Sequence, residues 1–202
     1  VQQIGGLNVA DTDQTGHDNT STTSVKGDEN NVDIDQIGDN NSAKADAVKT
    51  AGIFADRNTL TAFQEGNNNF VQTEVRSDDN TVDSNQDGDN NYHRFAVRGS
   101  DNTLTSDVDG NSNRGDWKVG SGFPPNADNN TIDLVQAGDG NYSTGRINGD
   151  NNNVTAHQTG NSNRIGTSWY TGNGVVITGD DNTADIMQNG DSNQAFSSQI
   201  GD

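Results

Sequence analysis

An asparagine returns along this chain at a nearly fixed interval, and that interval limits the folds the chain can adopt. Most steps are 11 residues, as from Asn8 to Asn19, and three are longer, at 17, 17 and 19 residues. A short fixed period is typical of stacked, equivalent structural units. We therefore expect a repeat stack and not a globular enzyme with one unique site. The members of the series are Asn8, Asn19, Asn30, Asn41, Asn58, Asn69, Asn80, Asn91, Asn102, Asn113, Asn130, Asn141, Asn152, Asn163, Asn182 and Asn193.

The true repeat is 22 residues long, because two unlike halves alternate. Counting from each asparagine as position zero, every second segment carries glutamine at position +6, and only Val108 breaks that row. In the alternate segments position +6 is mostly apolar, from Val25 to Trp169. We call the two kinds of segment the glutamine half and the apolar half. The glutamines are Gln14, Gln36, Gln64, Gln86, Gln136, Gln158 and Gln188.

Within each half, the side chains alternate with the period of a β-strand. In the glutamine half, positions +2 and +4 are largely apolar, as at Val32 and Ile34, while Thr and Asp fill the positions between them. Position +8 is usually glycine, which reverses the chain without a Cβ penalty. The sequence therefore predicts an all-β fold: a β-solenoid of about eight two-strand coils, with two parallel in-register sheets in cross-β stacking. The turn glycines of the glutamine halves are Gly16, Gly38, Gly66, Gly88, Gly110, Gly138, Gly160 and Gly190.

The composition is unusual for an ordered chain. Only 27% of the 202 residues are hydrophobic and the net charge is −19, which normally indicates disorder. Backbone ladders and stacked Asn and Gln amides can hold such a chain without a large apolar core. We expect one domain over residues 1–202. The three long steps predict turn insertions near 47–57, 119–129 and 169–181, protruding as loops at one edge.

Several functional classes have little support. The chain has no cysteine, and no apolar run approaches the length of a membrane span. Its acidity argues against nucleic acid as a partner. His17, His93 and His157 lie in different phases of the repeat, and no nucleophile stands beside a base. We therefore predict no catalytic residue and no required cofactor.

Two binding interpretations remain open alongside a structural one. Asp28, Asp78, Asp150 and Asp180 lie in turns whose stacked carboxylates offer oxygen ligands to calcium. The plainer interpretation is that Asp favours turns and keeps the chain soluble. Thr and Asp also share the outward positions of the glutamine halves. The alternative function is accordingly a monomeric β-solenoid that binds calcium, mineral or ice through this Thr/Asp face.

The outward positions of the apolar halves differ, because they collect cations and aromatic rings. This difference predicts a lateral contact in which the basic face of one stack meets the Thr/Asp face of another. The residues predicted to make it are Arg94, Arg114, Arg146, Arg164, Tyr92 and Tyr142.

The pattern resembles the curlin repeat, in which Gln-x-Gly-x-x-Asn-x-Ala recurs at fixed spacing. Asn8-x-Ala10 leads here to Gln14-x-Gly16-x-x-Asn19. This chain has asparagine where the family usually has serine, and its apolar halves lack the glutamine. The resemblance implies a secreted subunit of extracellular functional amyloid fibres at the cell surface, as in biofilm matrix and adhesion. It also implies that the main partner is the chain itself, added head to tail, with lateral bundling of filaments. The start at Val1 instead of Met fits a mature product after signal cleavage.

Overall fold

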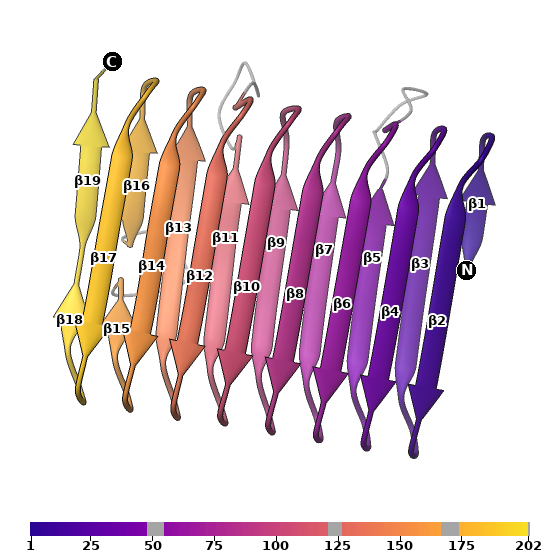
Figure 1. The fold of residues 1–202 in the computed structure, drawn as a ribbon, viewed down its shortest axis with the longest axis horizontal. Helices are drawn as coiled ribbons and strands as arrows, with labels where there is room; N and C mark the ends of the chain where they lie inside the picture. The colour runs from indigo at the N-terminus through magenta and orange to yellow at the C-terminus, as the bar shows by residue number, and fades with distance from the viewer. Residues whose placement is uncertain (48–54, 121–126, 167–173, 202) are drawn as a thin grey trace.

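The computed structural model describes residues 1–47, 55–120, 127–166 and 174–201, and these form a stack of flat coils (Figure 1). The chain runs up one sheet, turns, runs down the other sheet and turns again. Each strand pairs in parallel with the strand one coil later. The two ends of the described chain lie at opposite ends of the stack. The predicted all-β solenoid with two parallel in-register sheets is confirmed.

The glutamine halves form the first sheet, which we call the glutamine sheet. Its register places equivalent residues side by side, so that Gln14 pairs with Gln36 and Gln36 with Gln64. Its eight strands are β2 (Val9–Thr15), β4 (Asn31–Ile37), β6 (Thr59–Glu65), β8 (Thr81–Asp87), β10 (Thr103–Asp109), β12 (Thr131–Ala137), β14 (Asn153–Thr159) and β17 (Thr183–Asn189).

The apolar halves form the second sheet, which we call the basic sheet after the cations on its outer face. Its strands follow the same parallel register along the stack. They are β1 (Gln2–Ile4), β3 (Thr20–Lys26), β5 (Ser42–Ala47), β7 (Phe70–Val75), β9 (Tyr92–Val97), β11 (Arg114–Val119), β13 (Tyr142–Asn148), β15 (Arg164–Ile165), β16 (Val175–Thr178), β18 (Gln194–Ala195) and β19 (Ser197–Ile200).

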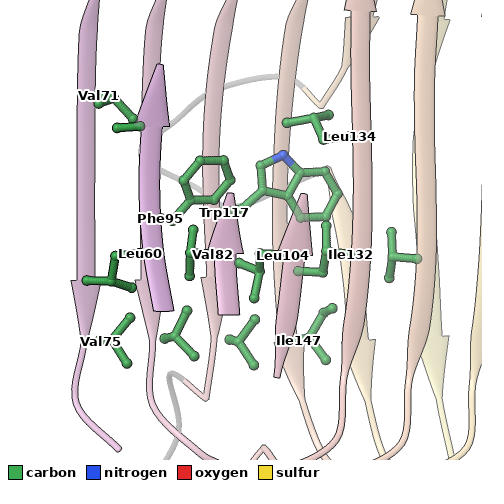
Figure 2. Packing of buried hydrophobic residues seen from close by; sticks show 14 of the residues in the cluster. Leu60, Val71, Val75, Val82, Phe95, Leu104, Trp117, Ile132, Leu134 and Ile147 are labelled. Atoms are coloured by element: carbon green, nitrogen blue, oxygen red, sulfur yellow. The ribbon is translucent and has the colours of Figure 1, made fainter. Parts of the chain in front are cut away.

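A thin apolar core lies between the two sheets. Alternate side chains face it, which is why every second residue of β4 and β8 is buried. The largest core side chains are Phe95 and Trp117, neighbours in register on β9 and β11 (Figure 2). Trp117 fits because its next neighbour in the row is Gly145, where a Cβ would lie 2.1 Å from the indole Cζ3. The core is therefore filled by matching large and small residues along a row.

The turns need glycine for two reasons. Gly38 has φ of +112°, which side chains with a Cβ rarely adopt, and an added Cβ would lie 2.0 Å from the Gly66 carbonyl oxygen. The second reason exists only in the stack, because the close neighbour belongs to the next coil. Glycine at position +8 thus permits both the local turn and the close spacing of the coils.

The third expected insertion is misplaced. Val175–Thr178 fall inside the 169–181 range, yet they form β16 and pair with Gly145–Asn148 of β13. Ile177 therefore fills the inward position expected for Trp169, which lies outside the described residues. In the described residues, two separate pieces, β15 and β16, pair with β13. The long step from Asn163 to Asn182 therefore interrupts a strand and not a turn. The cores of the other two expected insertions, 48–54 and 121–126, also lie outside the described residues.

Candidate functional site

The inward glutamines form hydrogen-bonded rows along the stack. Gln14 Nε2 donates to Gln36 Oε1 at 2.6 Å, and the chain of bonds continues to Gln64 at 2.8 Å and to Gln86 at 2.9 Å. A second run joins Gln136, Gln158 and Gln188 at 2.9 Å each. The same amides cross the core to the backbone of the basic sheet, as Gln86 Nε2 does to the Phe70 carbonyl at 3.2 Å. The glutamines therefore link coil to coil, and several of them also link the two sheets.

A buried histidine fills the break in the glutamine row. Val108 stands in register between Gln86 and Gln136 and cannot donate a hydrogen bond to the Gln136 amide oxygen. His93 reaches across from β9, with Nε2 2.9 Å from Gln136 Oε1 and Nδ1 2.7 Å from Ser106 Oγ. Because Gln136 Oε1 only accepts, Nε2 carries the hydrogen and the Ser106 hydroxyl donates to Nδ1.

Burial lowers the pKa of His93 to about 4, and its bond to Gln136 opposes that shift. The side chain is fully buried, so the neutral ring is a structural part of the ladder at neutral pH. The sequence did not single out this role. The available signal in the sequence was that an inward-facing histidine occurs close to the break in the glutamine row at Val108.

The asparagines form two rows that bond to backbone as well as to side chains. In the row that starts at Asn8, the backbone N–H and the side-chain amide of Asn58 both donate to Asn30 Oδ1, at 2.9 and 3.0 Å. In the row that starts at Asn19, the Asn91 amide donates instead to the Gly110 carbonyl at 2.8 Å. Most members are buried, and those in the end coils are more exposed. Each asparagine thus ties its own turn to the turn of a neighbouring coil.

The turns that follow the glutamine strands carry an alternating row of Asp and Asn, which we call the alternating edge. Each side-chain Oδ1 accepts the backbone N–H of the same position one coil earlier, at 2.7–3.0 Å. The Asn amides also donate to the next Asp, as Asn67 does to Asp89 at 3.1 Å. Carboxylates therefore stand two coils apart, about 10 Å, with a donor between them. In order the row is His17, Asp39, Asn67, Asp89, Asn111, Asp139, Asn161 and Asp191.

The opposite turns carry the four residues proposed as calcium ligands, in a row that we call the acidic edge. Their carboxylates accept backbone N–H groups of the preceding coil, as Asp28 does from Gly6 at 2.6 Å and Asp180 from Asp150 at 2.8 Å. Within the ranges that the structure describes, no three His, Cys, Asp or Glu side chains form a group that could hold a metal ion. In order the row is Asp28, Asp56, Asp78, Ser100, Asp128, Asp150 and Asp180.

The outer faces of the two sheets are chemically different. On the glutamine sheet, Thr and Asp alternate along one row, and Thr105 Oγ1 donates to Asp133 Oδ1 at 2.9 Å. At one end of this face the acids crowd together. Desolvation, followed by the charges of Asp33, Asp13 and Asp11, raises the pKa of Asp35. This face therefore holds a concentration of negative charge.

On the basic sheet, four of the six predicted lateral-contact residues form one row. Tyr92 stacks on Phe70 with ring centroids 4.7 Å apart, and the Arg114 guanidinium lies 4.6 Å from the Tyr92 centroid. Further along, the Arg164 guanidinium lies 5.1 Å from the Tyr142 centroid. The structure does not bring the other two predicted residues, Arg94 and Arg146, into this row. They line a separate hollow toward the C-terminal ends of β9 and β11.

Together, the ladders and turns define a β-solenoid built from a 22-residue, two-strand repeat. The family model of the curlin associated repeat matches residues 127–160 and 179–202. These two segments are therefore similar to the curlin associated repeat, and the resemblance seen in the sequence is confirmed there. No curated protein and no solved structure matches the chain. Among the described residues, no helix is long and apolar enough to cross a membrane.

Proposed function

We propose that the chain is a structural subunit that polymerises head to tail into secreted, curli-like extracellular fibres, with a role in biofilm matrix and cell adhesion. The curlin repeat match supports a structural role over a catalytic one. The observation that carries the proposal is the continuity of the side-chain rows, which run in register through the stack up to its edge strands, β2 and β17.

The two edges of the glutamine sheet complement one another. Gln14 Oε1 is the acceptor end of the glutamine row, and the Gln188 amide is the donor end. Gln188 Nε2 bonds to the Arg164 carbonyl, as Gln64 Nε2 bonds to Ser42 while also donating along its row. A second copy placed with β2 on β17 continues the ladder. A repeated contact between unlike ends does not close, so it grows a filament.

Lateral bundling follows from the unlike outer faces. The Thr/Asp face of one filament meets the row of Tyr92, Arg114, Tyr142 and Arg164 on another, where guanidinium groups pair with carboxylates. Each exposed pair contributes only about 0.2–1 kcal/mol, and salt screens it. The pairs recur in every subunit, so they sum along the filament.

Electron microscopy and fibre diffraction of the purified chain test the proposal. We expect fibres with a meridional spacing of about 4.8 Å and a subunit repeat of about eight strand spacings, roughly 40 Å. Only monomers at high concentration and neutral pH would overturn it. Monomers that instead bound calcium, mineral or ice would support the alternative function.

A further inference from the structure

The outer face of the basic sheet contains a hollow of about 270 Å³. It lies where one outward row is interrupted by a small side chain. In register along that row stand Glu74, Ala96, Lys118 and Arg146, so the Ala96 methyl sits between long neighbours. Gly120, at the end of β11, adds no side chain to the rim. We call this feature the basic hollow.

Four cations surround the basic hollow, namely Arg94, Arg98, Lys118 and Arg146. Arg94 on β9 and Arg98 directly after β9 flank Ala96 along the chain, while Lys118 and Arg146 follow on the next two strands. Like charges in register on neighbouring strands destabilise a sheet. The arrangement therefore carries a cost that a bound anion would remove.

The chain is rich in acids, yet these four cations have no ion pair among the described residues. Other cations do, since Lys44 lies 2.9 Å from Asp46 and Arg57 lies 2.6 Å from Asp79. Two acids stand near the hollow. Glu74 lines it but pairs with Arg76.

The other acid, Asp116, is buried and lies in register beside Arg94. In the described chain, no cationic nitrogen lies within 4 Å of its carboxylate. The cations of the rim outnumber these two acids. In a protein with 30 acidic and 11 basic residues, four unpaired cations around one hollow leave an excess of positive charge at a single point.

We propose that the basic hollow binds a small multivalent oxyanion of the phosphate class. Guanidinium forks pair with phosphate oxygens bidentately, and lysine adds a point charge. The volume lies just below the usual range of about 300–1,000 Å³ for ligand pockets, which suits a di- or triphosphate. A neutral sugar is a poorer fit. The nearby Tyr92 ring is covered by Phe70 on one side and by Arg114 on the other, so it offers no free face for stacking.

Calorimetric titration of the full chain with inorganic pyrophosphate tests the proposal, at about 150 mM salt so that diffuse attraction is screened. We expect one saturable site per chain. Ala96→Gln fills the hollow without changing any charge and should abolish binding. Arg146→Gln and Lys118→Gln should each weaken binding about tenfold or more. Lys44→Gln, which removes the same charge elsewhere on this sheet, is the matched control and should change affinity less than twofold.

Absence of saturable binding would overturn the proposal, as would an equal loss in Lys44→Gln, which would show diffuse attraction only. Binding that survives Ala96→Gln would also overturn it. Flotation with phosphatidic acid vesicles distinguishes a phosphate carried by a lipid headgroup from a free phosphate anion. Vesicle binding that Ala96→Gln removes assigns a lipid headgroup, and pyrophosphate binding without vesicle binding assigns a free anion. The titration does not depend on fibre formation, so its outcome is independent of the proposed function.

Discussion

At the residue scale, the break at Val108 shows how a ladder is kept intact without its usual residue. His93 supplies from the opposite sheet the donor that position 108 lacks, and Ser106 satisfies the second ring nitrogen. A buried amide oxygen without a donor costs about 1–3 kcal/mol, so this replacement matters to the stability of the stack. It also makes one titratable group part of the core.

His93 predicts a loss of stability in mild acid. Its folded pKa of about 4 lies below the ordinary 6.5, so the unfolded chain binds the proton more readily. The contribution of neutral His93 to the free energy of unfolding is therefore fully present above about pH 6.5 and is lost progressively as the pH falls to about 4. This difference corresponds to roughly 3 kcal/mol. In denaturant titrations across this range, His93→Gln should show a shallower pH dependence than the unmodified chain.

The exposed His17 provides the control for that measurement. His17→Gln removes a histidine without touching the core and should keep the pH dependence of the unmodified chain. Equal slopes for His93→Gln and the unmodified chain would contradict the assignment of acid sensitivity to His93.

Gly145→Ala should strain the core, because the new Cβ would lie 2.1 Å from Trp117. Overpacking of this kind costs typically about 1–3 kcal/mol. The midpoint of chemical unfolding should fall, and adding Trp117→Leu should recover part of the loss. Gly6→Ala is the control, since its nearest neighbour beyond the adjoining residues would be 3.6 Å away. An unchanged midpoint in Gly145→Ala would contradict the large-and-small packing of this row.

At the element scale, the two rows of turns differ in how closely their carboxylates are spaced. The alternating edge separates its carboxylates by an amide donor in each intervening coil. The acidic edge places Asp28, Asp56 and Asp78 in successive coils, at about 4.8 Å spacing. Because both rows use the same backbone bond, the difference between them is one of charge.

Replacing Asn67, Asn111 and Asn161 by Asp should therefore destabilise the stack at low salt. Each change removes a donor to the next carboxylate and brings like charges to one strand spacing. The melting temperature should fall and then recover as salt is added. Asp78→Asn on the acidic edge keeps the acceptor oxygen, removes a charge and should raise the melting temperature. Loss of stability that salt does not restore would point to altered turn geometry instead of charge.

The sequence predicted the strands, their pairing and the inward rows, because these depend only on the period. It missed Asp56 and Asp128 in the acidic edge, because alanine precedes both of them, whereas glycine or serine precedes the four residues that were named. Counting back from Asn58 and Asn130 places both correctly. It also misplaced the third insertion, where the apolar run before Gly179 was the available signal. The contacts of His93 and the hollow at Ala96 join different coils, so no single repeat reveals them.

At the scale of the whole molecule, the described strands give the basic sheet more coil levels than the glutamine sheet. The basic sheet starts with β1 on β3 and ends with β18 and β19, while the glutamine sheet runs only from β2 to β17. If β17 of one copy receives β2 of the next, then β19 arrives at the register positions that β1 holds on β3. Gln3 and Gln199 share one row of the register, and Ile4 and Ile200 share the next. Gln3-Ile4-Gly5 even repeats Gln199-Ile200-Gly201.

This overlap predicts that β1 holds the place of the incoming strand and is displaced during fibre growth. All three residues of β1 are exposed, so its release should cost only about 1–3 kcal/mol for a few hydrogen bonds. Deleting Gln2–Ile4 should quicken growth severalfold in a turbidity or dye-binding time course, while the β-sheet circular dichroism of the monomer stays unchanged. Deleting Ser198–Ile200, the matched change on the incoming strand, should slow growth. Slower growth after loss of β1 would instead place Gln2–Ile4 inside the junction, paired with the neighbouring copy.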